Sequence, residues 1–321
     1  MYSPQNPNAG EMETTGAAID RRTLFLGLLV GIATAAAFGL GGFFLIEDER
    51  GAMGSVLFLL LPFATGFATA LVARRINLMV ASLIIGLVLC TAVLLATGRE
   101  GWVCLLMSLP LIIIGLSFGA LLGHLFRRYI LDRSSKPTML SLLVLSVLPL
   151  FLLGANSIEK PSRQNPRAET FTSVLIVAAP REKVWNSIKT MDRVNAHKGF
   201  LMRIGLPVPV SCSVDKEEVG GTRTCNFESG FIKERITEWD PPRGMKLEVT
   251  DWDVPGRPWL DFKDASYELR EENGKTIMIR TTTIASRLLP AWYWKRLEQI
   301  GVETEHEYLF ESITNQVQGE R

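Results

Sequence analysis

Five long apolar runs set the first half of the chain apart from a polar second half. None of the runs has Asp, Glu, Lys or Arg in its interior, and they cover residues 23–46, 54–73, 77–97, 102–126 and 138–155. Each is close to the ~20 residues that a helix needs to cross a bilayer. Buried helices of a soluble protein would instead show a polar face. The pattern predicts a polar N-terminal tail over residues 1–22 and a five-helix transmembrane domain over residues 23–155.

Basic residues between the runs predict an orientation. Eight lie on the side of the N-terminus, namely Arg21, Arg22, Arg74, Arg75, Arg127, Arg128, Arg133 and Lys136. Five lie on the other side, namely Arg50, Arg99, Lys160, Arg163 and Arg167. Because Lys and Arg gather on the cytoplasmic side, we expect a cytoplasmic N-terminus and a C-terminal domain outside the cytoplasm. The fifth run is the shortest and contains Pro149; if it does not cross, the C-terminal domain is cytoplasmic.

Small residues recur every four positions in the first and fourth runs. They include Gly27, Gly31, Gly115 and Gly119. This spacing lets helices approach closely. It is compatible with a homo-oligomer formed through these glycines, although ordinary packing within the bundle is the interpretation that we favour. Transport usually needs ionisable groups inside the membrane, and only His124, at a helix end, is such a group here. The bundle therefore reads as an anchor or scaffold.

The polar half begins with a linker over residues 156–169 that contains two prolines. A strand then leads into a short helix at residues 181–191, and a second short helix and loop follow at 192–209. Alternating apolar residues between Gly, Pro and Asn turn signals predict six strands, at residues 210–218, 222–227, 231–238, 245–252, 265–272 and 275–285. A long helix over residues 288–317 closes the chain.

Three segments of the polar half carry a family resemblance. They read "VLIVAAPREKVWNSI", "FIKERITEWDPPRGMKLEV" and "GKTIMIRTTTIASRLLPAWYW". Together they resemble the helix-grip superfamily that includes START domains and polyketide cyclases. The resemblance implies a curved antiparallel sheet around a long C-terminal helix, with a cavity between them, over residues 170–321. The predicted fold class is thus a multi-pass α-helical membrane bundle followed by an α+β helix-grip domain. The superfamily ranges from lipid carriers to cyclases and hormone receptors, so fold alone does not fix the ligand.

Alternation along each predicted strand selects one face for the cavity. On the strands the candidates are Phe227, Glu234, Ile236, Leu247, Tyr267, Ile279 and Thr281. On the last helix they are Val302, His306 and Leu309, which recur at helical spacing. Glu234 and His306 are polar residues in an apolar pattern. They either orient a polar ligand group or transfer a proton, or else they complete the fold through a partner such as Arg280 or Arg235 for Glu234.

Three tryptophans and two cysteines add further candidates. Trp252, Trp259 and Trp292 could line the cavity mouth or simply pack in the core. Cys212 and Cys225 lie on adjacent strands. A tight turn at residues 220–221 would separate them by roughly 13 Å, beyond disulfide reach. A four-residue loop at 217–220 would place them directly opposite. A location outside the cytoplasm would permit a bridge and the cytoplasm would disfavour it; the alternative is two small buried side chains.

Other chemistry is not indicated. The chain has three histidines, no Cys-x-x-Cys pair and a net charge of +1, so we expect no metal, no cofactor and no nucleic-acid partner. The favoured hypothesis is a membrane-anchored binding module. Its partners would be the lipid bilayer and a lipid or other apolar small molecule held in an internal cavity. The alternatives are a membrane-tethered scaffold or signalling protein, and a cyclase- or hydrolase-type enzyme that uses Glu234 and His306 as acid and base.

Overall fold

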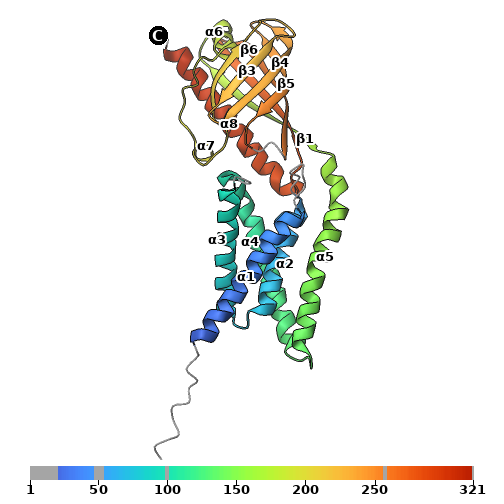
Figure 1. The fold of residues 1–321 in the computed structure, drawn as a ribbon. Helices are drawn as coiled ribbons and strands as arrows, with labels where there is room; N and C mark the ends of the chain where they lie inside the picture. The colour runs from blue at the N-terminus through green and yellow to red at the C-terminus, as the bar shows by residue number, and fades with distance from the viewer. Residues whose placement is uncertain (1–20, 47–53, 98–100, 256–258, 320–321) are drawn as a thin grey trace, which may run out of the picture.

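The computed structural model describes residues 21–46, 54–97, 101–255 and 259–319. Most of the expected polar tail, together with Arg50 and Arg99, lies outside the described residues. Helices make up the first half of the molecule, and a sheet with a long C-terminal helix makes up the second (Figure 1).

The apolar runs form helices that lie side by side and alternate in direction (Figure 1). In chain order they are α1 (Arg21–Ile46), η1 (Val56–Leu60) with α2 (Leu61–Val72), α3 (Ile76–Ala96), α4 (Trp102–Phe126) with η2 (Arg127–Leu131), and α5 (Pro137–Gln164). Four segments are long and apolar enough to cross a membrane: Arg21–Ile46, Ile76–Ala96, Trp102–Leu131 and Pro137–Ser162. The second predicted span is a shorter apolar helix, Val56–Val72.

The glycine stripes lie at contacts between helices of the same chain. Gly31 of α1 faces Ser82 of α3, and a side chain there would collide with it. On α4, a methyl group added at Gly115 would lie 2.7 Å from the Leu59 carbonyl oxygen, and one at Gly119 would clash with the Phe63 backbone. These glycines allow α1 to pack on α3 and α4 to pack on α2, as expected for packing within the bundle.

Helix α5 continues beyond the predicted end of the fifth run. The expected linker over residues 156–169 is helical through Gln164, and the first strand begins at Arg167. In this extension the Glu159 carboxylate accepts hydrogen bonds from the backbone N–H groups of Ser55 and Val56, at 2.6 and 3.2 Å. A carboxylate at a helix N-terminus satisfies otherwise unpaired donors. The polar composition alone did not reveal this contact with another helix.

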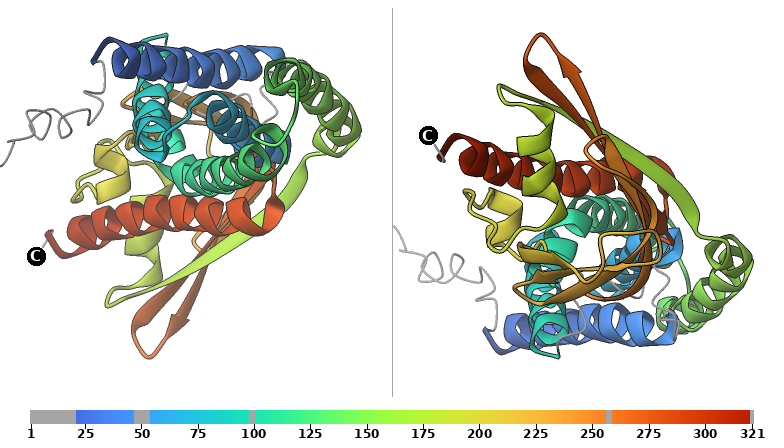
Figure 2. Two further views of the ribbon diagram at one scale, coloured as in Figure 1. Left: turned by 90° about the horizontal axis from the view of Figure 1, so that it is seen from below. Right: turned by 90° about the horizontal axis from the view of Figure 1, so that it is seen from above.

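The second half contains seven strands and three helices. They are β1 (Arg167–Val177), α6 (Arg181–Lys189), α7 (Phe200–Arg203), β2 (Pro209–Val214), β3 (Thr222–Phe227), β4 (Gly230–Asp240), β5 (Gly244–Asp253), β6 (Leu260–Glu272), β7 (Lys275–Ser286) and α8 (Ala291–Gly319). The strands form one antiparallel sheet in the order β1-β7-β6-β5-β4-β3-β2. The sheet curves around α8 (Figure 1 and Figure 2), which is the helix-grip arrangement. The predicted order of elements is confirmed.

The predicted inward face of β7 is wrong. Ile279 and Thr281 lie on the outer face, where the Thr281 hydroxyl meets the Thr172 hydroxyl at 3.0 Å. The buried positions are the alternate ones, which include Met278, Arg280 and Thr282. Both faces of β7 carry apolar and Thr residues: Ile277, Ile279 and Thr281 on one, and Thr276, Met278 and Thr282 on the other. Apolar alternation therefore could not identify the inner face.

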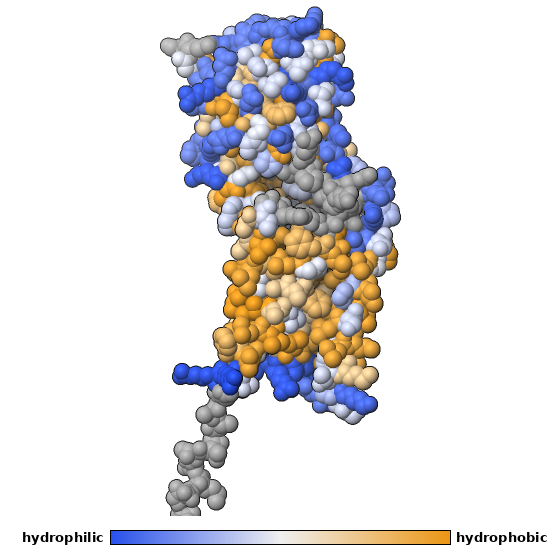
Figure 3. Space-filling model, viewed as in Figure 1, coloured by the Kyte–Doolittle hydropathy of each residue, from blue (hydrophilic) through white to orange (hydrophobic). Residues whose placement is uncertain are grey.

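The two halves contact each other through an apolar cluster. Phe58 and Leu111 of the helical half pack with Leu288 and Trp294 of the helix-grip half. The Tyr293 hydroxyl also donates a hydrogen bond to the Met107 carbonyl oxygen. In Figure 3 apolar residues cover the visible face of the helical half, whereas hydrophilic residues dominate the helix-grip half. The surface thus changes from mainly apolar to mainly hydrophilic where the two halves meet.

Candidate functional site

A single cavity extends from the helical half into the interior of the helix-grip half. Its volume is about 980 Å³. From the helical half it is lined by apolar residues of α1 to α4, among them Phe43, Leu61, Leu87, Trp102 and Ile112. From the helix-grip half it is lined by residues of β3 to β7 and α8, among them Phe227, Val249, Ala265, Ile284, Val302 and Leu309. Small-molecule sites are typically apolar hollows of ~300–1,000 Å³, so this one is at the large end.

Aromatic side chains surround the cavity where the two halves meet. Trp259 and Trp294 both line it, and the ring of Trp294 lies 4.8 Å from that of Phe58, centroid to centroid. The loop at residues 204–209 also lines it, and Gly205 in this loop lies close to Val103 at the start of α4. The junction is therefore built from both halves and does not divide the cavity.

Five polar residues form a cluster inside the helix-grip part of the cavity. An Arg223 N–H donates to the Glu234 carboxylate at 2.6 Å. An Arg280 N–H group donates to both oxygens of Glu305 at 2.9 Å, and another donates to the Tyr267 hydroxyl oxygen. The guanidinium groups of Arg223 and Arg280 lie 5.6 and 5.0 Å from the centroid of the Tyr267 ring. Two cations therefore face one aromatic ring, and each has its own carboxylate.

Burial shifts the ionisation of this cluster. Burial by itself would lower the pKa of Arg223, but the adjacent Glu234 outweighs it, so the pKa of Arg223 lies above its usual value. The pKa of Glu305 is raised, because burial disfavours its charged form more than Arg280 favours it. Arg223 is therefore a fixed cation, whereas Glu305 takes up a proton more readily than an exposed glutamate.

Part of the hydrogen-bonding capacity of the two arginines is unused. Among the described residues, the buried side-chain atoms without a hydrogen-bond partner are Arg223 Nε and Nη2, Arg280 Nε and, elsewhere, Arg181 Nε. Arg223 is 2% exposed and Arg280 is 7% exposed. The unpaired atoms of these two arginines are thus all donors.

His306 is fully buried and does not line the cavity. Its ring nitrogens meet the hydroxyl groups of Thr282 and Ser173, both at 2.8 Å. Burial, and then the positive charge of Arg280, lower the pKa of His306 to about 2. A neutral imidazole with both nitrogens occupied completes the fold, and Glu234 is held by Arg223. The hypothesis of an acid–base pair formed by Glu234 and His306 gains no support from this geometry.

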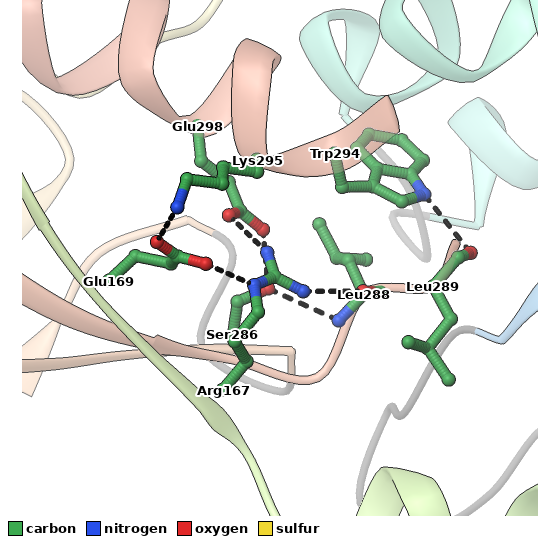
Figure 4. A network of polar contacts seen from close by, with 8 residues as sticks. All are labelled: Arg167, Glu169, Ser286, Leu288, Leu289, Trp294, Lys295 and Glu298. Atoms are coloured by element: carbon green, nitrogen blue, oxygen red, sulfur yellow. Dashed lines mark hydrogen bonds and ion pairs between the residues drawn. The ribbon is translucent and has the colours of Figure 1, made fainter. Parts of the chain in front are cut away.

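A second polar network ties the sheet to the start of α8 (Figure 4). Arg167 donates to Glu169 at 2.7 Å, to Glu298 at 2.6 Å and to the Leu288 carbonyl oxygen at 3.3 Å. Lys295 pairs with the other oxygen of Glu169 at 2.6 Å. Burial opposes the charged form of Glu169, but the two cations outweigh it and lower its pKa. Because Glu298 and Trp294 also line the cavity, the network holds the junction end of α8 in place.

The predicted site residues fall into four groups. Phe227, Glu234, Tyr267, Val302, Leu309 and Trp259 line the cavity. Ile236 and Leu247 are buried in the adjoining core, and Trp252 packs against Phe262 in a smaller cluster. Trp292 is 73% exposed and is not among the lining residues. Ile279 and Thr281 face outward, as described above.

The sequence predictions did not include two charged residues that line the cavity, Arg223 and Glu305. Arg223 shares a strand face with Cys225 and Phe227, so alternation could have placed it inside. Glu305 lies on the stripe of α8 that includes Trp294, Gly301 and Leu309, all of which line the cavity. A glutamate in an amphipathic helix reads as exposed. Of the predicted stripe, Val302 and Leu309 line the cavity, whereas the neighbour of Glu305, His306, does not.

Cys212 and Cys225 are joined by a disulfide. They are directly opposite in the β2–β3 register, as the four-residue loop requires, and both line the cavity. Stable disulfides belong to oxidising compartments. Within the described residues, no group of three or more His, Cys, Asp or Glu side chains could hold a metal ion.

Solved structures of low sequence identity match the C-terminal half and have helix-grip folds. Ara h 8.0201 has 12% identity, a TM-score of 0.33, and coverage of 48% of this chain and 99% of its own. Norcoclaurine synthase from Thalictrum flavum, in complex with dopamine and hydroxybenzaldehyde, has 13% identity and a TM-score of 0.34, and the match covers 50% of this chain and 91% of the synthase. The Aha1 dimer from Colwellia psychrerythraea has 13% identity and a TM-score of 0.30, and the match covers 46% of this chain and 98% of the Aha1 chain. No family model matches the chain, and no curated protein matches it significantly. Likenesses this distant carry no argument about function, which depends instead on the cavity.

Proposed function

We propose that this protein is a membrane-anchored binding module that takes a lipid or another apolar small molecule into its cavity. The observation that carries the proposal is the continuity of the cavity between the apolar helices and the helix-grip interior. An apolar molecule dissolved in the bilayer could pass between the helices into the protein without crossing water. Transfer of apolar surface into water costs ~25 cal/mol per Å², so such a path favours uptake from the membrane.

Two further observations support an orientation for this module. The start of α1 and the α2–α3 and α4–α5 connections lie at the end of the helical half away from the helix-grip half (Figure 1). That end carries Arg21, Arg22, Arg74, Arg75, Arg127, Arg128, Arg133 and Lys136. We assign it to the cytoplasm by the positive-inside rule. The helix-grip domain is then outside the cytoplasm, which agrees with its disulfide.

A pair of variants on neighbouring residues tests the cavity. Val249 of β5 lines it, and the next residue, Thr250, is exposed on the opposite face. The full chain in detergent should bind tritiated hexadecane at about one molecule per chain, measured by scintillation proximity. Val249→Trp should lower binding several-fold because the larger indole takes up part of the cavity beside β5, whereas Thr250→Trp should bind as the unmodified chain does. A natural chain that binds no hexadecane and purifies without any extractable lipid would refute the proposal.

A further inference from the structure

The cavity has a polar recognition site within its apolar wall. Arg223 and Arg280 are more than nine-tenths buried, both line the cavity, and three of their nitrogen atoms have no partner among the described residues. A buried donor without a partner costs roughly 1–3 kcal/mol. Arg223 and Arg280 both line the cavity, and three such atoms on two lining residues favour a ligand that accepts hydrogen bonds.

The protein's own carboxylates near these arginines are already engaged. Glu234 is held by Arg223, and both oxygens of Glu305 are held by Arg280. Acceptors for the remaining N–H groups have to come from outside the protein, from water or from a ligand in the cavity. A guanidinium group presents its N–H groups in a planar fork that suits two oxygens of one planar group. Carboxylate and ester groups have this shape, and a single carbonyl oxygen can accept from one of the N–H groups, whereas an ammonium group offers only donors.

The position of the arginines fixes the direction of the ligand. Both guanidinium groups lie beside the Tyr267 ring, which places the two cations at the same part of the cavity wall. Glu305 follows Trp294 by eleven residues on α8, which is roughly 16 Å along a helix. The lining between this cluster and the helical half is mostly apolar, with Trp259, Trp294 and Leu297 along it. A chain attached to the head group would extend through the junction toward the apolar helices.

We infer that the cavity takes an amphiphile whose head group presents carbonyl or carboxylate oxygens to Arg223 and Arg280 and whose apolar chain points toward the helical half. This inference rests on the proposed function, because it specifies the ligand of the same cavity.

Four tritiated probes of equal chain length test the inference on the full chain in detergent. They are hexadecanoic acid, methyl hexadecanoate, hexadecylamine and hexadecane. We expect the acid and the ester to bind at least tenfold more tightly than hexadecane, and the amine to bind no more tightly than hexadecane. The ratio of acid to ester then distinguishes a fatty-acid ligand from an uncharged ester lipid.

Paired substitutions identify the residues responsible. Replacing a whole buried ion pair by apolar residues is often tolerated, whereas removing one partner leaves a buried charge. Arg223→Met with Glu234→Leu, and separately Arg280→Met with Glu305→Leu, should each reduce the preference for acid and ester over hexadecane at least fivefold. The matched control is Arg235→Met with Glu248→Leu, an exposed Arg–Glu pair joining β4 to β5, which should keep the preference. Thermal unfolding of each variant checks that it is folded.

The outcomes separate the two proposals. If all four probes bind equally, the head-group inference is overturned and the proposed apolar binding stands. A preference that survives in both paired variants also overturns it, because the oxygens are then recognised elsewhere. If neither hexadecane nor any other probe binds, both proposals fail together.

Discussion

At the scale of single residues, the buried ionisable groups of the helix-grip half are of two kinds. His306 is surrounded by protein, with Thr282 and Ser173 at its ring nitrogens. Arg223 and Arg280 instead line the cavity and keep buried donors without a partner among the described residues. The first arrangement is complete without a ligand and the second is not. The adjacent residues Glu305 and His306 on α8 therefore have different roles, one in the cavity cluster and one in the core.

His306 predicts a dependence of stability on pH. Its pKa is about 2 in the folded protein and 6.5 in an unfolded chain, so protonation favours the unfolded state. Its contribution is complete above pH 6.5 and declines as pH falls. Lowering the pH from 7.5 to 5.5 should reduce the free energy of unfolding by about 1.4 kcal/mol through this residue.

Urea titration of the full chain in nanodiscs, followed by tryptophan fluorescence, measures this loss. The variant His306→Gln should show much less change across the same two pH units, whatever its absolute stability. An equal pH dependence in the two proteins would assign the effect to other groups.

At the scale of elements, close helix packing gives the helical half its shape. Helices α2 and α4 approach through Gly115, Gly119 and Gly123, each of which lies against backbone atoms of the facing η1–α2 segment. Helices α2 and α4 also both contribute to the cavity. Their separation therefore sets the width of the hollow at the helical end.

A leucine at one of these glycines should force the helices apart. Gly119→Leu would clash with the Phe63 backbone, whereas Gly41, on α1, has nothing within 4 Å of an added Cβ. We expect Gly119→Leu to lower the apparent melting temperature of the detergent-solubilised chain by several degrees, and Gly41→Leu to leave it nearly unchanged. Fluorescence-detected size exclusion after heating provides the measurement. Similar melting in both variants would show that the α2–α4 contact is not tightly packed.

At the scale of the whole molecule, the alternating helices α1 to α5 place the start of α1 and the helix-grip half at opposite ends (Figure 1). The basic residues that flank the helices from Arg21 to Lys136 gather at the end where α1 begins, and the disulfide lies in the domain at the other end. Opposite compartments for the two ends follow if these helices cross a membrane. The cavity then opens from the bilayer into a domain on the outer side.

Accessibility to a membrane-impermeant maleimide tests this orientation in whole cells. In a background with Cys90→Ala and Cys104→Ala, a cysteine at Glu271, on the exposed end of β6, should be labelled without permeabilisation. A cysteine at Ser135, between η2 and α5, should be labelled only after the membrane is opened. The reverse pattern would place the helix-grip domain in the cytoplasm.

The sequence by itself determined the elements, because their signals are local. Uninterrupted apolar runs predicted the helices, and alternation between turn residues predicted the strands; β3 has the predicted bounds, Thr222–Phe227. Alternation also placed Glu234, Tyr267 and Phe227 on the inner face. These predictions need only the periodicity of a helix or strand and the preference of apolar side chains for a common face.

Only the tertiary structure decided how those faces are used. The inner face of β7 depends on neighbours from distant parts of the chain, so Ile279 and Thr281 were placed on the wrong side. Glu159 extends α5 by capping a helix more than a hundred residues earlier, and the partner of Glu234 is Arg223, on the next strand of the sheet. The cavity itself exists only where two separately patterned halves meet. Contacts between segments far apart in the sequence leave no local pattern, and for that reason the architecture was predictable but only part of the cavity lining was.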